Sequence, residues 1–124
     1  MSSDIDVRYE IEVADEIDKV LERAISITLQ EIEISCASLT VLLTDDEHMR
    51  KLNRKVRDLD RATDVLSFPS GDAKPNETEA LPYLGDIAIS VPIAKKQAQT
   101  NGHSLMAEIQ LLAIHGVLHL LGFD

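Results

Sequence analysis

Aromatic side chains are almost absent from this chain. Its 124 residues include no tryptophan, two tyrosines and two phenylalanines. Surfaces on which nucleic-acid bases could stack are therefore scarce, so any nucleic-acid binding is expected to address the phosphate backbone with little sequence preference. The single cysteine, Cys36, cannot form an internal disulfide and is typical of a protein from a reducing cytosol.

Long apolar runs are missing as well. No stretch reaches the ~20 apolar residues that a membrane span requires, and acidic groups are spread through the first thirty residues. We therefore expect neither a membrane helix nor a signal peptide, and we predict a cytoplasmic protein with no membrane partner. The length suits a single domain over residues 1–124 that buries about two-thirds of its unfolded surface.

Positive charge is scarce overall but concentrated in one segment. The net charge is −10, and residues 1 to 33 carry ten acidic groups against three basic ones. Residues 50 to 61, in contrast, hold six of the twelve lysines and arginines. A basic patch in an acidic chain is a plausible docking site for phosphates.

Four arginines in this segment share one predicted helix face. They follow the spacing i, i+4, i+7 and i+11 and are Arg50, Arg54, Arg57 and Arg61. A solvated helix face is the simpler explanation for such a stripe. Its contrast with the acidic remainder of the chain favours RNA binding through these four side chains.

The first half of the chain shows a strand, a helix, a second strand and a second helix. Apolar residues alternate from Ile5 to Val13, which predicts a half-buried strand, and residues 17–28 follow helical spacing. Residues 39–43 form a second apolar strand. The capping-box pattern Thr44-Asp45-Asp46-Glu47 then predicts the start of a second helix.

The second half adds two strands and two helices. Strands are predicted over residues 65–68 and 87–91, with an exposed loop over 70–82. A short helix begins at Pro92 and ends at Asn101-Gly102, and Ser104 caps a terminal helix. The predicted fold is one α+β domain with a four-stranded sheet covered by helices.

The terminal helix carries two histidines in a metal-binding arrangement. His115 and His119 are four residues apart, so their imidazoles lie on one helix face and can share an ion. Gly122 can end the helix and turn the chain back, which would put a third ligand immediately after Asp124. The segment is apolar nearly all round, so we expect the imidazoles to be buried and to need partners or a metal.

The last ten residues, His115 to Asp124, resemble the signature of the YbeY family of metal-dependent endoribonucleases, which are implicated in ribosomal RNA maturation. Two further blocks agree with this resemblance, residues 52–57 followed by 63–69, and residues 84–90. The resemblance implies a mixed, mostly parallel sheet with an antiparallel edge and a chain that stops just before the third metal ligand. The chain departs from the family pattern at Val56, at Ala62 and in lacking the third histidine.

The histidine motif favours cleavage of phosphodiesters over cleavage of peptides. Zinc peptidases carry a general-base glutamate beside the first histidine, and Gly116 stands there in this chain. Phosphodiester hydrolysis is more tolerant, because a metal activates water and polarises the phosphoryl oxygen. Zinc suits the imidazole ligands, and the resemblance places a catalytic arginine at Arg57. Asp86 either orients a ligand histidine or a water through a hydrogen bond or serves as a turn acid.

Other polar residues are assigned simpler roles. Ser67 is predicted to be structural, and His48 and His103 are predicted to be solvated. Glu108 either reaches the histidine site or is favoured by its place near a helix N-terminus.

We therefore expect a zinc-dependent, single-strand-specific endoribonuclease that acts in ribosomal RNA processing and ribosome quality control. Its expected partners are single-stranded and ribosomal RNA, together with ribosome-associated proteins. The alternative is a non-catalytic RNA- or ribosome-associated metal-binding module. Metal content and sensitivity to a chelator separate the two.

Overall fold

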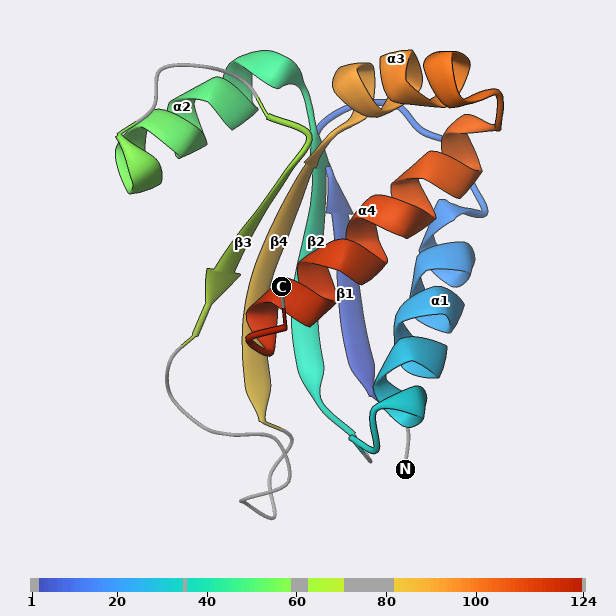
Figure 1. The fold of residues 1–124 in the computed structure, drawn as a ribbon, viewed down its shortest axis with the longest axis vertical. Coiled ribbons are helices and arrows are strands. Elements are labelled where there is room, and N and C mark those ends of the chain that lie inside the picture. Colours follow the sequence, from blue (N-terminus) through green and yellow to red (C-terminus); the bar gives the residue numbers. More distant parts are fainter. Residues whose placement is uncertain (1–2, 35, 59–62, 71–81, 124) are drawn as a thin grey trace.

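The fold is a four-stranded sheet with helices on both faces (Figure 1). The computed structural model describes residues 3–34, 36–58, 63–70 and 82–123. In chain order the elements are β1 (Asp4–Tyr9), α1 (Ile17–Glu31), β2 (Ser38–Thr44), α2 (Asp46–Arg57), β3 (Val65–Pro69), β4 (Tyr83–Ser90), α3 (Val91–Asn101) and α4 (Leu105–Leu120). This confirms the predicted α+β class; most of the loop expected over residues 70–82 lies outside the described residues.

The sheet has the order β1-β2-β4-β3. The pairs β1–β2 and β2–β4 are parallel, whereas β3 runs antiparallel to β4 at one edge. The mixed sheet with an antiparallel edge that the family resemblance implied is therefore confirmed. Both β1 and β3 are edge strands, and β3 is the one beside α4 (Figure 1).

Helices α1 and α4 cover one face of the sheet, which we call the closed face (Figure 1). In α1 the buried residues recur every four positions, as the amphipathic pattern predicted. They pack with the inward side chains of β2 and β4, and the central members of this cluster are Leu21, Ile25, Leu39, Val41, Leu43, Ile87 and Ile89. Burial of this set is the main stabilising contribution to the fold.

Helix α2 packs on the opposite face, which we call the open face. Its Met49 is buried against Leu66 and Ala88, with Leu52 and Phe68 half-buried beside them. Because side chains alternate along β4, Ala88 points to the open face while Ile87 and Ile89 point to the closed face.

Three predicted elements have other boundaries in the structure. The strand predicted over residues 87–91 is β4, which begins at Tyr83, and Val91 is the first residue of α3. The alternation of Ile5 to Val13 continues past the end of β1, which stops at Tyr9, because pairing with β2 ends at the Tyr9–Leu43 position. The N-cap of α2 is Asp45 rather than Thr44: the Asp45 carboxylate accepts from the His48 backbone N–H at 2.8 Å. The Thr44 hydroxyl instead donates to Glu10.

Candidate metal centre and RNA contacts

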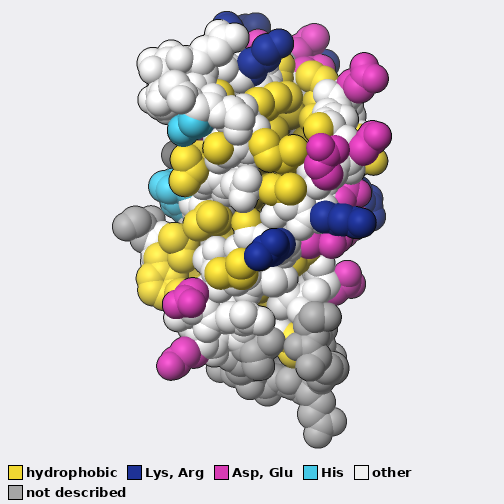
Figure 2. All heavy atoms as spheres, turned by 90° about the vertical axis from the view of Figure 1, so that its right-hand side faces the viewer, with side chains coloured by type: hydrophobic (Ala, Val, Ile, Leu, Met, Phe, Trp, Pro, Cys, Tyr) yellow, Lys and Arg dark blue, Asp and Glu magenta, His cyan; other side chains and the backbone are white. Residues whose placement is uncertain are grey.

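Helix α4 presents its two histidines at the surface. Its closed-face side is buried, with Ile109, Leu112, Ala113 and Val117 in the core. His115 and His119 lie on the other side and are exposed, with ring centroids 5.7 Å apart. In Figure 2, histidine side chains lie at the surface along the left margin of the view, beside apolar ones. The expected burial of the imidazoles was therefore wrong, because α4 is covered on one side only.

Gly116 brings α4 close to the sheet. A Cβ at this position would lie 2.8 Å from Cγ2 of Ile87 in β4, so the helix backbone rests directly on that side chain. The position after the first histidine faces the sheet, and a glutamate side chain would have no room there. The peptidase arrangement that the sequence disfavoured is thus also excluded by packing.

Gly122 ends the helix in the manner that the sequence predicted. Its φ is +87°, in the left-handed region, and its N–H donates to the His119 carbonyl at 3.1 Å. The N–H of Phe123 donates back to the Leu118 carbonyl at 2.9 Å, which completes a Schellman motif. These two bonds hold the turn that follows Leu121. Asp124 lies outside the described residues.

The two histidines share a cleft with β3. The cleft has a volume of about 490 Å³ and is lined by Thr63, Asp64, Val65, Leu66, Ser67, His115 and His119. The Ser67 hydroxyl donates to the Gly116 carbonyl at 3.1 Å, which ties β3 to α4 between the histidines and fits its predicted structural role. The imidazole pair suits zinc, although the described residues contain no group of three His, Cys, Asp or Glu side chains able to hold an ion.

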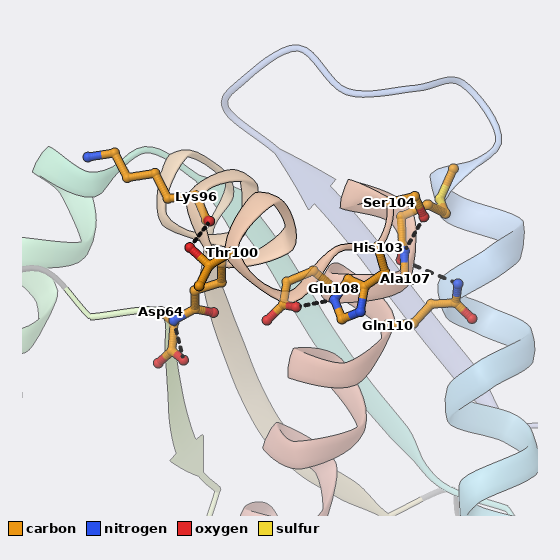
Figure 3. A network of polar contacts seen from close by, with 10 residues as sticks. Asp64, Lys96, Thr100, His103, Ser104, Ala107, Glu108 and Gln110 are labelled. Atoms are coloured by element: carbon orange, nitrogen blue, oxygen red, sulfur yellow. Dashed lines mark hydrogen bonds and ion pairs between the residues drawn. The ribbon is translucent and has the colours of Figure 1, made fainter.

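Asp64 is the residue of this cleft that the sequence analysis missed. It stands just before β3, beneath α3 (Figure 3), and is half-buried. Its Oδ1 accepts from the Val65 backbone N–H at 2.8 Å, and its Oδ2 accepts from Nε2 of Gln97 in α3 at 3.2 Å. A polar residue before a short apolar strand was the available signal, but it equally fits a turn.

Only part of the predicted arginine stripe lies within the described residues. Arg50 and Arg54 are exposed on α2. Arg57 is the last residue of α2, but its side chain lies outside the described part of the structure, as does Arg61. Since α2 packs on the open face and α4 on the closed face, Arg50 and Arg54 lie on the opposite side of the sheet from His115 and His119.

Asp86 lies away from the histidines. It is exposed on the open face and lines a groove there with Arg8, Thr40 and Lys55. The Tyr83 hydroxyl donates to its carboxylate, and burial together with this bond raises the pKa of Tyr83. The hydrogen bond from Asp86 to a ligand histidine that we considered does not form in this structure, because the sheet lies between them.

His48 and His103, which were expected to be solvated, are half-buried and exposed, respectively, and each also has an acidic partner. His103 Nε2 lies 2.5 Å from Oε1 of Glu108, and Figure 3 shows this pair at the turn between α3 and α4. Glu108 is 5% exposed and is directed to His103, away from the metal cleft. On the open face, His48 Nδ1 lies 2.5 Å from Oε1 of Glu10. Hydrogen bonds from Thr44 and His48 lower the pKa of Glu10.

Among the described residues no helix is long and apolar enough to cross a bilayer.

Comparison with known proteins gives one consistent result. A family profile described as Endoribonuclease YbeY matches residues 4–124. Proteins named Endoribonuclease YbeY from Desulforamulus reducens and Carboxydothermus hydrogenoformans are 41% and 38% identical to the chain; the alignments cover 95% and 100% of the chain and 79% and 82% of those proteins. The solution structure of a Thermotoga maritima protein superimposes with a TM-score of 0.65 at 26% identity, over 97% of this chain and 73% of that one. The chain therefore belongs to the endoribonuclease YbeY family.

Proposed function

We propose that this protein is a zinc-dependent endoribonuclease that cleaves single-stranded RNA in the cytoplasm and acts in ribosomal RNA maturation and ribosome quality control. Hydrolysis of RNA is supported by membership of a family named for that activity. The observation that carries the proposal is the cleft in which His115 and His119 lie beside one another opposite β3.

Zinc is the proposed ion because the donors are imidazoles on one helix face. His115 and His119 would hold it, and the third ligand implied by the family resemblance would follow Asp124. A bound ion would supply the charge and acidity needed to activate water and to polarise a phosphoryl oxygen. The exposure of both imidazoles fits this role, since the open side of the site must admit a phosphodiester.

The chain's own residues would bring RNA to this cleft. Arg50 and Arg54 would bind phosphates from α2, and Arg57 and Arg61 would continue the same stripe. Because α2 and α4 lie on different faces of the sheet, an RNA strand bound to α2 would pass around the β3 edge to reach the histidines. Arg57 is the proposed catalytic cation, since a guanidinium can grip two phosphate oxygens at once. Ribosome-associated proteins remain proposed partners.

A non-catalytic RNA- or ribosome-associated module is the alternative. The named activity of the relatives does not favour it. It differs from the proposal in one measurable respect, because a module without chemistry would bind RNA and leave it intact whether or not zinc is present.

Zinc titration of three proteins tests the proposal. The present chain should bind zinc weakly, His119→Ala should not bind it stoichiometrically, and a chain with one histidine added after Asp124 should bind it tightly. His48→Ala removes an imidazole from the open face and serves as the matched control. RNA cleavage should appear with tight binding and disappear with a chelator. If the extended chain binds zinc no better than the present one, the third-ligand argument is wrong.

A further inference from the structure

We propose that Asp64 is a catalytic residue of the histidine cleft. Its carboxylate binds the water that attacks the phosphodiester and takes a proton from it. The inference rests on the proposed RNA hydrolysis and adds a general base, which the histidine motif itself does not contain. It starts from the position of Asp64 in the lining of the cleft with His115 and His119.

The carboxylate is held in a fixed orientation from two elements. The Val65 N–H donates to Oδ1 at 2.8 Å, and the Thr63 hydroxyl donates to the same atom at 3.3 Å. Gln97 Nε2 donates to Oδ2 at 3.2 Å from α3. In addition, the Asp64 carbonyl accepts from the Ser90 N–H at 2.9 Å, which fixes the backbone to the end of β4. A general base must be oriented in this way to be effective.

The carboxylate retains capacity for a water molecule. An ionised carboxylate offers about four acceptor positions on its two oxygens. The three donors named above take two positions on Oδ1 and one on Oδ2. One position on Oδ2 therefore remains, and the half-buried side chain lines a cleft large enough for several solvent molecules.

The other polar groups that line the cleft are poorly suited to act as the base. An imidazole nitrogen that binds zinc cannot accept a proton, which removes the ligating atoms of His115 and His119. The Ser67 hydroxyl is engaged with the Gly116 carbonyl, and that of Thr63 with Asp64 itself. The base therefore comes from the β3 side of the cleft. On the α4 side, the close packing of Gly116 against the sheet leaves no room for a glutamate.

The proposed step balances without a further reactant. The water oxygen forms a bond to phosphorus, and the bond from phosphorus to the leaving ribose oxygen breaks. One proton passes from the water to Asp64 and then to solvent, and the leaving oxygen takes a proton from solvent.

Asp64→Asn tests this role, because asparagine has the same size and its Oδ1 still accepts from the Val65 N–H. Rotation of the Gln97 amide restores the second hydrogen bond. We expect the single-turnover cleavage rate to fall by about 10²–10⁴-fold in the histidine-extended protein. Zinc affinity measured without RNA should fall by no more than about fivefold, since Asp64 acts on the ion only through its charge and not as a ligand. Affinity for a single-stranded oligonucleotide should rise by up to about fivefold, because a negative charge leaves the path of a phosphate. Asp15→Asn, at an exposed site before α1, is the matched charge control.

Three outcomes would overturn the inference. A cleavage rate within about threefold of the parent would show that no base is lost. Loss of zinc affinity would make Asp64 a ligand instead. A parallel fall in cleavage, RNA affinity and unfolding temperature would make it structural; Gln97→Leu, which keeps the charge and should reduce cleavage less than Asp64→Asn, separates that case. If the parent does not cleave RNA, the proposed function fails, and the affinity for the oligonucleotide then tests the role of Asp64. Tighter binding by Asp64→Asn supports the place of this carboxylate beside the phosphate. Equal binding overturns the inference.

Discussion

The two faces of the sheet differ in what they bury. On the closed face, α1 and α4 enclose one continuous core that includes inward residues from all three parallel strands. On the open face, the buried hydrophobic cluster in the described residues is Met49, Leu66 and Ala88. Beside it runs a groove of about 750 Å³ with Arg8, Lys55 and Asp86 among its lining residues. Stability therefore depends on the closed face, whereas the open face and the β3 edge keep polar surface available for binding.

The largest difference in stability between the faces should appear when one leucine on each face is replaced by alanine. Leu21 is 0% exposed in the closed-face core, so Leu21→Ala should lower the free energy of unfolding by about 2–5 kcal/mol. Leu52→Ala on the open face should cost clearly less, because Leu52 is only half-buried and the site can fill with water. Urea denaturation of both variants measures the two values. Equal losses would contradict the assignment of stability to the closed face.

Gly116→Ala should destabilise the protein by about 1–3 kcal/mol from overpacking, partly offset by a gain of about 1 kcal/mol in helix propensity. The added methyl would meet Ile87, which is 0% exposed and has no space to move away. Thermal unfolding should show the net loss.

A double mutant sharpens this test. Ile87→Ala removes all three atoms that the new methyl would approach within 3.2 Å. The combined variant should therefore lose less stability than the two single losses added together. Strict additivity would mean that α4 does not rest on Ile87.

On the open side, Arg54→Ala should weaken binding of single-stranded RNA and reduce the slope of log K against log salt by about 0.7. The reason is that one exposed guanidinium no longer releases a counterion from the RNA. The control is Arg23→Ala, which removes an exposed arginine from α1 on the other face. A similar change in slope for both variants would show that RNA binding does not distinguish the two faces.

The smallest expected effect concerns the pair of Glu10 and His48. The pKa of Glu10 lies below its ordinary value of 4.5 in the folded state, mainly through the hydrogen bond from Thr44 and then the one from His48. Its stabilising contribution is therefore complete above pH 4.5 and is lost as the pH falls through the lower folded-state value. Glu10→Gln should be slightly less stable than the parent at pH 7, and the difference should shrink on acidification. A difference that does not shrink on acidification would contradict this contribution.

Periodicity predicted the elements of the fold well because local spacing reflects which side of an element is buried. The four-residue recurrence in α1 and the glycine at the end of α4 both appear in the structure as predicted. The end of β1 was missed, because alternation continues beyond the point where β2 offers a partner. Strand pairing is a long-range property, and the mixed sheet came from the family resemblance.

The site shows the same division between local and distant information. His115 and His119 were found because their spacing is local. Asp64 was missed because it comes close to the histidines only where β3 lies beside α4. In the sequence, Asp64 and His115 are 51 residues apart. The assumption that an apolar helix is buried all round failed at the exposed imidazoles for a similar reason, since the coverage of a helix depends on which partners exist.

The packing of α4 also couples folding to the assembly of the site. This helix follows all four strands in the chain order and supplies Ile109, Leu112, Ala113 and Val117 to the closed-face core. During synthesis the strands therefore emerge before part of their apolar cover. His115 and His119 lie on the same helix, so a chain in which α4 has not yet docked has neither a finished core nor the histidine pair beside β3. Docking of α4 completes both in one step.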